Sequence, residues 1–363
     1  MAQQFTAPKF PIVKPSIYNE LRKRVQDYFD KEGKESTGNL KLYTKAFVFV
    51  GVLLAVFVHV VFFTPAWYFA LLECLAMGMA AAGIGFNVMH DGSHGSFSKS
   101  DILNKTAAFS LNILGGSAFM WNIKHNQIHH SFTNVDGVDD DIEAGIFLRL
   151  APNQKRYFFH RLQHLYFWAL YCILYIFWIF FADYKKYFTS KIGEVPIGTM
   201  KWNNHLVFWS GKLLHFVLFV AIPIYVVGFL PWLVGFLVMT FSTGLVISIV
   251  FQLAHTVEHT HFPMADEETN KLPDEFAIHQ IKTTANFATN SKIVSWLVGG
   301  LNFQIEHHLF PKISHVHYPA ISKIVKSVCQ EFGVEYNEYK TLPQAVVAHI
   351  RFLKEMGKPS IAA

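Results

Sequence analysis

The hydrophobic positions of the chain fall into long uninterrupted runs separated by polar stretches. Residues 46–63 and 66–89 form one pair of runs around the turn Thr64-Pro65, and residues 213–230 and 232–254 form a second pair around Pro231. The shortest runs have 18 residues and the longest has 24. At about 1.5 Å per residue these helices reach roughly 27 to 36 Å, which is enough for a hydrocarbon core of about 30 Å. The pattern predicts an all-α integral membrane protein with two transmembrane helical hairpins, and therefore four spans.

Charge along the chain predicts which ends of these helices face the cytoplasm. Residues 1–45 are polar, carry nine Lys and Arg, and lack the apolar core of a signal peptide, so we expect no secretion signal. Neither hairpin tip carries a Lys or Arg, whereas residues 183–212 and the C-terminal third carry many. The positive-inside rule then places the tips outside and both hairpin bases in the cytoplasm. Glu73, the only charge in the second run, is expected near the membrane interface.

A fifth apolar run covers residues 165–182. If it crossed the membrane once, the second hairpin would be inverted and the charge-rich C-terminal region would lie outside. We therefore interpret it as an interfacial or partly submerged helix, a depth that suits its aromatic side chains. The expected organisation is a cytoplasmic N-terminal segment (1–45), one domain that contains the spans (46–335) and a cytoplasmic tail (336–363). Residues 318–332 and 343–356 have the periodicity of amphipathic helices.

Composition supports a membrane protein and draws attention to histidine. The 363 residues are 52% hydrophobic and 16% charged and include 36 Phe, far more apolar bulk than a soluble core of this size needs. The three cysteines have no metal-ligand spacing, which argues against a disulfide framework or a zinc ribbon. The chain has 19 histidines, well above an ordinary share.

Three histidine clusters follow the apolar runs. They are His90-Asp-Gly-Ser-His94, His125-Asn-Gln-Ile-His129-His130 and Gln304-Ile-Glu-His307-His308. A spacing of four residues places two imidazoles on one helix face, where both reach a single metal ion. In the second cluster an α-helix would put His125 and His129 on one face and turn His130 about 100° away. That helix could then serve two metal ions.

The number of histidines predicts two metal ions. His255 ends the fourth apolar run as His90 ends the second, so both emerge at the same membrane surface. A single HxxxH is more often a solvated turn, but three clusters at the hairpin bases argue against that reading. Eight histidines exceed one coordination sphere. Neutral imidazole suits iron, copper, zinc and nickel, but zinc has no redox chemistry and its catalytic sites use few ligands. A crowded nitrogen site therefore indicates oxygen activation at iron.

With these motifs, the sequence resembles the membrane-bound histidine-box di-iron fatty acid desaturases. HDxxH, HNxxHH and QxxHH in place of HxxHH resemble the front-end acyl branch, such as linoleoyl-CoA desaturase. The likeness extends to the flanking segments and covers about residues 40–335. These flanking segments are Asn87-Val-Met before the first histidine cluster, Ser131-Phe-Thr-Asn134 after the second, Phe251-Gln-Leu-Ala before His255, and Phe303 to Pro311 around the third cluster.

The resemblance implies roles for individual residues. Iron ligands are implied at His90, His94, His125, His129, His130, His307 and His308, and His255 falls where the family places an additional histidine. Gln304 stands where other branches have histidine, and its amide oxygen would be a weak ligand or act through a water. His259, one turn after His255, is the competing residue for completing the site.

The other histidines are expected to be structural or outer-sphere residues. His59, alone inside the first span, is interpreted as a packing or hydrogen-bonding residue. We expect structural or outer-sphere positions for His261, His315 and His317, and no functional role for His160, His164, His205, His215, His279 and His349.

The acidic stretch Asp136-Gly-Val-Asp139-Asp140-Asp141 follows the second box. A carboxylate that accepts the spare imidazole N–H would orient a ligand and raise its basicity. A solvated turn that caps a helix is an equally good interpretation of the sequence. A calcium loop is not expected, because its spacing and distal Glu are absent.

The resemblance also implies the reaction. Two iron ions would use O2 and two electrons to abstract two hydrogens from adjacent carbons, leaving a cis double bond and water. The substrate would be an acyl-CoA or acyl-lipid held in an apolar tunnel within the bilayer, and no nucleic acid is expected. The sequence contains no His-Pro-Gly-Gly haem motif, so the expected donor is a ferredoxin or a free cytochrome b5 with its reductase. This departure from many eukaryotic relatives favours a bacterial inner membrane over the endoplasmic reticulum.

Other functions remain open at this point. A lipid hydroxylase, ketolase or sphingolipid-modifying enzyme could use the same scaffold, and would yield an alcohol or ketone rather than an alkene. A haem-binding membrane cytochrome would need paired histidines deep in the spans, where only His59 lies. A metal transporter would place ionisable residues along a midplane path, and the spans are almost free of them.

Overall fold

The computed structural model describes residues 5–359, which are mostly helical. The α-helices are α1 (Ile17–Glu32), α2 (Leu40–Val58), α3 (Trp67–Ile84), α4 (His90–His94), α5 (Asp101–Ile113), α6 (Ala118–Trp121), α7 (Gln163–Phe177), α8 (Asp183–Thr189), α9 (Trp202–Phe216), α10 (Ile222–Val227), α11 (Phe229–His255), α12 (Phe276–Thr283), α13 (Lys292–Leu297), α14 (Gln304–Leu309), α15 (Tyr318–Phe332) and α16 (Leu342–Met356).

Shorter elements connect or continue these helices. Five are π-helical, namely η1 (His59–Phe63), η2 (Gly85–Met89), η3 (Asn122–His129), η5 (Trp178–Ala182) and η6 (Val217–Ala221), and two are 3₁₀ turns, η4 (Phe158–Leu162) and η7 (His315–His317). The strands form two-residue pairs, antiparallel between β1 (Lys191–Ile192) and β2 (Val195–Pro196) and parallel between β3 (Asn286–Phe287) and β4 (Glu338–Tyr339).

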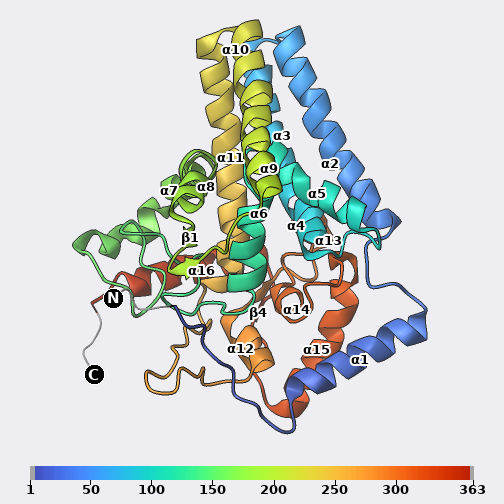
Figure 1. Ribbon diagram of the computed structural model, residues 1–363, viewed down its shortest axis with the longest axis vertical. Helices are drawn as coiled ribbons and strands as arrows, with labels where there is room; N and C mark the ends of the chain where they lie inside the picture. The colour runs from blue at the N-terminus through green and yellow to red at the C-terminus, as the bar shows by residue number, and fades with distance from the viewer. Residues whose placement is uncertain (1–4, 360–363) are drawn as a thin grey trace.

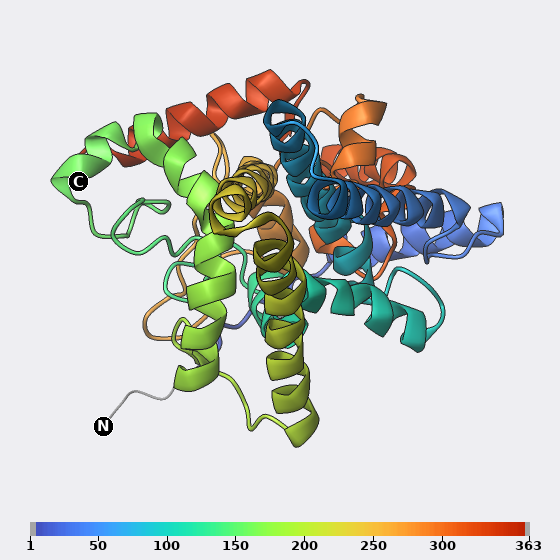
Figure 2. The same cartoon turned by 90° about the horizontal axis from the view of Figure 1, so that it is seen from above.

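Two long helical hairpins dominate the molecule. One consists of α2–η1 and α3–η2–α4, and the other of α9–η6–α10 and α11. Their turns lie together at one end of the molecule, and the other helices gather around their opposite ends (Figure 1). Viewed from the tips, the hairpins occupy the middle, while α1 and α16 extend to opposite sides (Figure 2). The predicted apolar runs therefore form paired helices. Some of these helices are longer than the runs and include polar residues at the base of the hairpin.

Small residues allow these helices to approach closely. A Cβ on Gly78 of α3 would lie 2.4 Å from the Met239 carbonyl oxygen of α11, and one on Gly244 of α11 would lie 2.7 Å from the Tyr171 carbonyl oxygen of α7. Such contacts suit helices in lipid, where van der Waals packing replaces the hydrophobic effect as the driving force for association. Gly78 belongs to the second apolar run, so a small residue of that run serves close helix packing.

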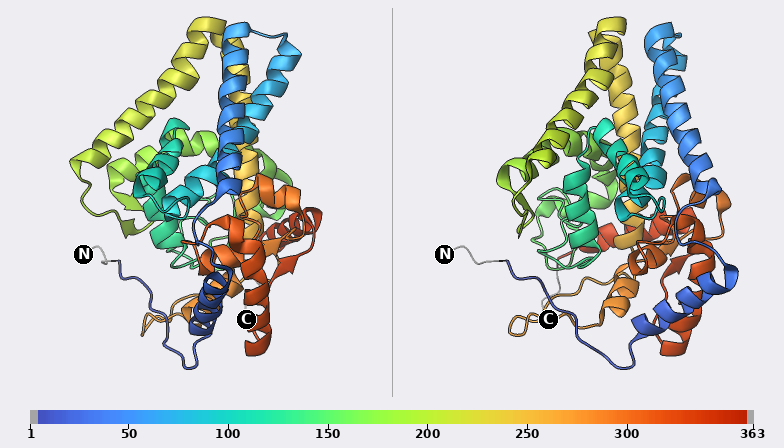
Figure 3. Two further views of the ribbon diagram at one scale, coloured as in Figure 1. Left: turned by 90° about the vertical axis from the view of Figure 1, so that its right-hand side faces the viewer. Right: turned by 45° about the vertical axis from the view of Figure 1, so that its right-hand side comes forward.

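Five helices in the described chain are long and apolar enough to cross a membrane, one more than the four predicted spans. The additional one, Phe158–Thr189, consists of η4, α7, η5 and α8. It lies beside the lower half of α11 and does not reach the hairpin tips (Figures 1 and 3). Hydropathy therefore counts five helices, and the position of the fifth has to be argued from its contacts.

Both ends of this fifth helix contact elements at the hairpin bases. Near its start, the Gln163 amide donates to the Leu353 carbonyl oxygen of α16 at 2.8 Å. Near its end, Lys186 lies 2.9 Å from Asp140, which belongs to the acidic stretch after the second histidine cluster. Buried Asp183 pairs with Lys212 at 3.0 Å, at the base of the second hairpin. These contacts favour the interfacial interpretation over a fifth span.

The helices α1, α12, α14 and α15 lie at the bases of the hairpins and pack around a separate core, and we call this part of the molecule the helical cap. Ile17, Leu21 and Val25 of α1 are buried in one core cluster with Val325 of α15. The periodicity predicted for residues 318–332 and 343–356 is confirmed by α15 and α16.

His59 and Glu73, near the first hairpin tip, pair at 2.9 Å, so His59 is a hydrogen-bonding residue as expected.

We predict that both hairpin tips face the outside of the cell and that the fifth helix has both ends in the cytoplasm. A membrane-impermeant thiol reagent added to intact cells should label Ala66→Cys, which is exposed at the first tip. It should label Lys99→Cys, Asn153→Cys and Glu194→Cys only after the membrane is permeabilised, since these exposed positions lie at the bases. The unsubstituted chain, with its three cysteines, measures background labelling. Labelling of Glu194→Cys but not Asn153→Cys in intact cells would establish a fifth span.

Candidate metal centre

Two π-helical segments position the first two histidine clusters. The span of α3 continues through η2 directly into α4, which carries His90 and His94. The second cluster lies on η3, where the His130 amide donates to the His125 carbonyl oxygen, five residues back. Five-residue hydrogen bonds of this kind are rare and occur often at functional sites. They change which side chains share a face, so the local winding decides the geometry of the site.

Eight histidines from separate parts of the chain converge on one buried site. Each of them exposes 9% of its surface or less. They are His90 and His94 of α4, His125 and His129 of η3, His130, His255 at the end of α11, and His307 and His308 of α14. Every histidine for which the sequence predicts a metal-binding role therefore lies at the same place, at the base of the hairpins.

The potential ligand atoms form two groups. His90, His94, His125 and His307 offer nitrogens that all lie within 4.8 Å of one another, and so do His129, His255 and His308. Helix η3 thus contributes to both groups, as predicted. His125 and His129 fall into different histidine groups, although the sequence sets His130 apart from these two. They remain neighbours, as their spacing predicts, since both also belong to a third group with Asp141.

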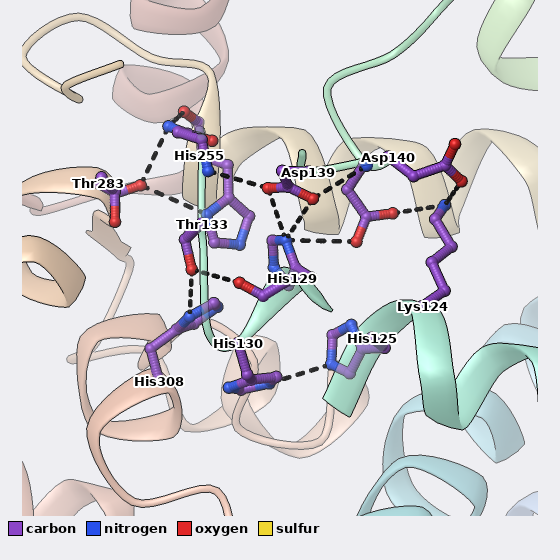
Figure 4. Close-up of polar contacts among 12 residues, drawn as sticks. Lys124, His125, His129, His130, Thr133, Asp139, Asp140, His255, Thr283 and His308 are labelled. Carbon is purple, nitrogen blue, oxygen red and sulfur yellow. Dashed lines mark hydrogen bonds and ion pairs between the residues drawn. The ribbon is translucent and has the colours of Figure 1, made fainter. Parts of the chain in front are cut away.

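The π-helical winding explains this difference. A residue five positions on returns to the same side of a π-helix, whereas in an α-helix it would point away. His130 Nε2 accordingly lies 3.2 Å from His125 Nε2, and the His130 ring stacks on that of His308 with centroids 4.3 Å apart. His130 therefore lies between His125 of one group and His308 of the other (Figure 4). The expected rotation of about 100° away from its neighbours is wrong for this helix.

Hydrogen bonds at Nδ1 fix the orientation of several rings. His129 donates from Nδ1 to Asp139 at 2.9 Å, and His308 donates from Nδ1 to the Gln280 amide oxygen at 2.9 Å. The Tyr318 hydroxyl lies 3.0 Å from His307 Nδ1. The two oxygens that can only accept, those of Asp139 and Gln280, place the proton of His129 and His308 on Nδ1 and leave the lone pair on Nε2, while Tyr318 fixes the direction of the His307 ring. The prediction that a carboxylate of the acidic stretch accepts an imidazole N–H is confirmed at Asp139, which is itself fully buried.

The opposite nitrogens have no partner among the described residues. Nε2 is buried and without a hydrogen bond in His90, His94, His129, His255, His307 and His308. An unsatisfied buried polar atom costs about 1 to 3 kcal/mol, so six in one place require an explanation. Metal ions bound between these nitrogens would satisfy all of them. The donor set therefore fits two metal ions of the kind that imidazole prefers.

Burial keeps most of these rings neutral, which ligation requires. It lowers the pKa of His125, His130, His307 and His308 well below the usual range, and neighbouring imidazoles lower it further. His129 is the exception. Burial opposes its charged form, but the carboxylates of Asp139 and Asp141 outweigh burial and raise the pKa of His129.

A second buried hydrogen-bond network, centred on Asp91, supports the first histidine cluster. His315 Nδ1 lies 3.0 Å from Asp91, and Lys45 Nζ lies 2.8 Å from His315 Nε2. Asp91 also accepts from the Ser314 hydroxyl at 2.7 Å. Because Asp91 follows His90 directly, this network fixes the start of α4. His315 therefore has the outer-sphere position expected from the sequence.

The two candidates for completing the site differ in burial. Gln304, one turn before His307 and His308 on α14, is 1% exposed, and its amide nitrogen has no partner among the described residues. His259 is exposed and belongs to neither histidine group. The structure therefore places Gln304, and not His259, among the buried residues beside the histidine groups. His261 is exposed as well, while His317 hydrogen-bonds to the Thr37 carbonyl oxygen at 3.2 Å.

Several residues that support the site carry no recognisable signal in the sequence. Gln280 of α12 contacts His308 and donates to the His130 carbonyl oxygen at 3.0 Å. Asn134, in the left-handed region at φ +58°, donates from its amide to the carbonyl oxygens of His255 and Thr283 at 2.8 and 3.2 Å. It thereby connects the second cluster to α11 and α12. Asn134 belongs to a segment noted for its resemblance, but its role as a connector required the structure.

Comparison with known proteins agrees with this geometry. Residues 65–340 match the family model described as fatty acid desaturase. The chain is 36% identical over 346 residues to the sn-1 linoleoyl-lipid 6-desaturase of Synechocystis sp., covering 94% of this chain and 95% of the relative. It is 34% identical to the protein of the same name from Arthrospira platensis, covering 93% and 92%. It is also 36% identical to the acyl-lipid (8-3)-desaturase of Physcomitrium patens, covering 94% and 72%. The chain belongs to the fatty acid desaturase family, whose members are oxidoreductases that introduce double bonds into fatty acyl chains.

Proposed function

We propose that this protein is a front-end acyl-lipid desaturase with two iron ions in its histidine site. A front-end enzyme places the new cis double bond between an existing one and the carboxyl end of the chain. The observation that carries the proposal is the pair of histidine groups with unpartnered Nε2 atoms, buried at the base of two apolar hairpins. The relatives named 6-desaturase and (8-3)-desaturase support the regioselectivity and a lipid-linked substrate.

The two groups define the proposed ligands of each ion. One iron would be held by His90, His94, His125 and His307, and the other by His129, His255 and His308. His130 lies between the groups and can serve either ion. Gln304 would complete the site through its amide, directly or through a water.

Iron, when bound, supplies the two-electron activation of O2 that hydrogen abstraction from an unactivated methylene requires. The protein contributes orientation and exclusion of water. Asp139 and Gln280 hold His129 and His308 in one tautomer, and together with Tyr318 they fix the directions of three rings, which would keep the Nε2 atoms directed at the metals. The near-complete burial of the eight imidazoles keeps bulk water away from the reacting carbons.

The proposal extends to the partners and the membrane. The lipid bilayer supplies the acyl chain, and a ferredoxin or a free cytochrome b5 with its reductase supplies the electrons. We propose a multi-pass location in a bacterial cell membrane, with the histidine site on the cytoplasmic side. The five apolar helices and the cyanobacterial relatives support this placement.

The first test is product analysis in a bacterial host that supplies linoleoyl lipids and a compatible electron donor. Wild type should produce a fatty acid with one additional double bond on the carboxyl side of the existing ones. His129→Ala should remove most of this product while leaving membrane-inserted protein, because ligands of one site act jointly. A hydroxylated product from wild type would instead establish the hydroxylase alternative. Unchanged product from His129→Ala would contradict the assignment of the site.

The second test concerns the carboxylate behind His129. Asp139→Asn should lower bound iron and activity by roughly 10- to 100-fold, since loss of the outer partner frees the tautomer and the ring of His129. Asp136→Asn, three residues earlier, serves as the matched control, because Asp136 makes no hydrogen bond or ion pair with a histidine among the described residues. Iron per protein is measured by mass spectrometry and products by gas chromatography. Equal iron content in wild type and Asp139→Asn would show that Asp139 only stabilises the loop.

The third test concerns Gln304. Gln304→His should still bind iron, because imidazole is a suitable ligand of similar length, but activity should fall since a tighter nitrogen donor competes with oxygen for an open position. Gln304→Glu should hold iron and change its redox balance through the added charge. The measurements are iron per protein and fatty acid products. If both variants match wild type in products, Gln304 is only a structural residue.

A further inference from the structure

Trp121, the last residue of α6, lies directly against the histidine site. Its indole stacks on the His125 ring with centroids 4.3 Å apart, and it approaches His90 and His94 edge-on at 5.7 and 6.0 Å. The side chain is buried. Trp121 therefore contacts three of the four histidines proposed to hold one iron, and the proposed metal site by itself assigns it no role.

A second tryptophan joins the same apolar cluster from another element. Trp178 of η5 packs against the small buried cluster to which Trp121 belongs. Its indole N–H donates to the carboxylate of buried Asp183 at 3.0 Å. An indole that has lost one electron is a strong acid at its nitrogen. Asp183 is therefore a proton acceptor already in place for an oxidised Trp178.

Aromatic residues of α8 and α9 continue from there to the surface. Asp183 pairs with Lys212 at 3.0 Å, and the Lys212 ammonium lies 4.9 Å from the centre of the Tyr184 ring. The Tyr184 and Trp209 rings have centroids 5.9 Å apart, and Trp209 is exposed. Helix α6 also packs directly against α8. These oxidisable rings, which we call the aromatic relay, are Trp121, Trp178, Tyr184 and Trp209.

The exposed end of the aromatic relay has a proton acceptor as well. The Trp209 indole N–H donates to the Tyr187 hydroxyl at 3.1 Å, and that hydroxyl lies 2.7 Å from His205 Nδ1. Indole N–H groups in proteins usually find some partner. Here the two partners are a carboxylate and a phenol bound to an imidazole, and both can take up or pass on a proton. This is the arrangement that reversible one-electron oxidation of Trp178 and Trp209 requires.

The electron balance of the reaction gives such a relay a use. Desaturation takes two electrons from the donor and two from the acyl chain for each O2 that is reduced to water. When no acyl chain is in place, the second pair of electrons is missing, and the oxidising power falls on the nearest side chains. The eight imidazoles are buried, so a soluble reductant does not reach them. Oxygenation of an imidazole destroys a ligand, and each such event would damage the site permanently.

We propose that the aromatic relay protects the histidine site by carrying electrons inward when O2 is consumed without a substrate. The inference rests on the proposed desaturase function and adds a thiol oxidase activity to it. Each oxidised ring is refilled by the next ring outward, and at Trp178 the proton leaves to Asp183 and returns on refilling. A cellular thiol refills Trp209 at the surface. In total, O2, two donor electrons, two protons and two thiols yield two waters and one disulfide.

The test follows the oxidation of individual residues by mass spectrometry. Purified, iron-loaded protein in dimyristoyl phosphatidylcholine nanodiscs, which offer no unsaturated chain, is reduced with dithionite, desalted and mixed with O2. A matched sample contains linoleoyl lipid. Without linoleoyl lipid, wild type should carry oxygenated Trp209 and, in rapidly frozen samples, an organic radical in the electron paramagnetic resonance spectrum. Linoleoyl lipid should lower both severalfold, and added glutathione should remove the Trp209 product and appear as its disulfide.

Two variants interrupt the relay at different points. Trp178→Phe keeps an aromatic ring but removes the oxidisable indole, and Tyr184→Phe removes only a hydroxyl. Both should lower oxygenation of Trp209 and give severalfold more oxygenated His125 per O2 consumed. Trp178→Tyr restores an oxidisable ring and should return the wild-type pattern, which a purely structural role of the indole would not allow. Trp168→Phe is the matched control, since Trp168 lies on the same long helix and is 37% exposed, close to the 45% of Trp209.

The outcomes separate this inference from the proposed function. The same oxidation pattern in wild type, Trp178→Phe and Tyr184→Phe would overturn the relay while the desaturase function stands. Oxygenation of Trp168 as strong as that of Trp209 would also overturn it, because general damage does not distinguish the two exposed rings. Absence of a new double bond in the sample with linoleoyl lipid would contradict the proposed function itself, and this inference with it.

Discussion

The whole arrangement depends on the burial of eight imidazoles, six of which have an Nε2 without a hydrogen-bond partner among the described residues. Close neutral imidazoles with unsatisfied lone pairs are unfavourable in a dry environment, and each must be held in place against that cost. The protein does so from the outer side of the rings, through Asp139, Gln280 and Tyr318. These contacts orient the lone pairs inwards, so that bound metal ions would convert an unfavourable cluster into a satisfied one.

This constraint also explains why the cap has to fold as one unit with the hairpins. The histidines come from α4, η3, α11 and α14, which no short-range interaction brings together. Asn134, just after the second cluster, hydrogen-bonds to carbonyl oxygens of α11 and α12, and Asp91 connects the first cluster to Ser314 and His315. A buried polar network of this kind is stabilising only when every member is satisfied. A rigid cap is therefore a requirement of the site and not an addition to it.

The sequence predicts the hairpins and the membership of the histidine cluster well, because both follow from strong local patterns. Long apolar runs leave little choice of structure in lipid, and three closely spaced histidine motifs rarely occur by chance. The division of the histidines into two groups was not predictable, since it depends on the π-helical winding of η3, which no residue pattern announces. Gln280 was missed for a related reason. Its role arises from the packing of α12 against α14, a contact between helices that are separate in the sequence.

Hydropathy alone does not determine whether the fifth apolar helix crosses the membrane, and its contacts supply the missing information. By length and composition, Phe158–Thr189 is as good a span as the other four. Its start is bound to α16 through Gln163, and its end is bound to Asp140, beside the second histidine cluster, through Lys186. Both partners belong to the base of the molecule, and a single crossing would separate the two ends by the full hydrocarbon thickness of about 30 Å. A helix anchored at the same level at both ends is compatible with lying in the interface, and that position keeps His90 and His255 on the same side of the membrane, as a shared metal site requires.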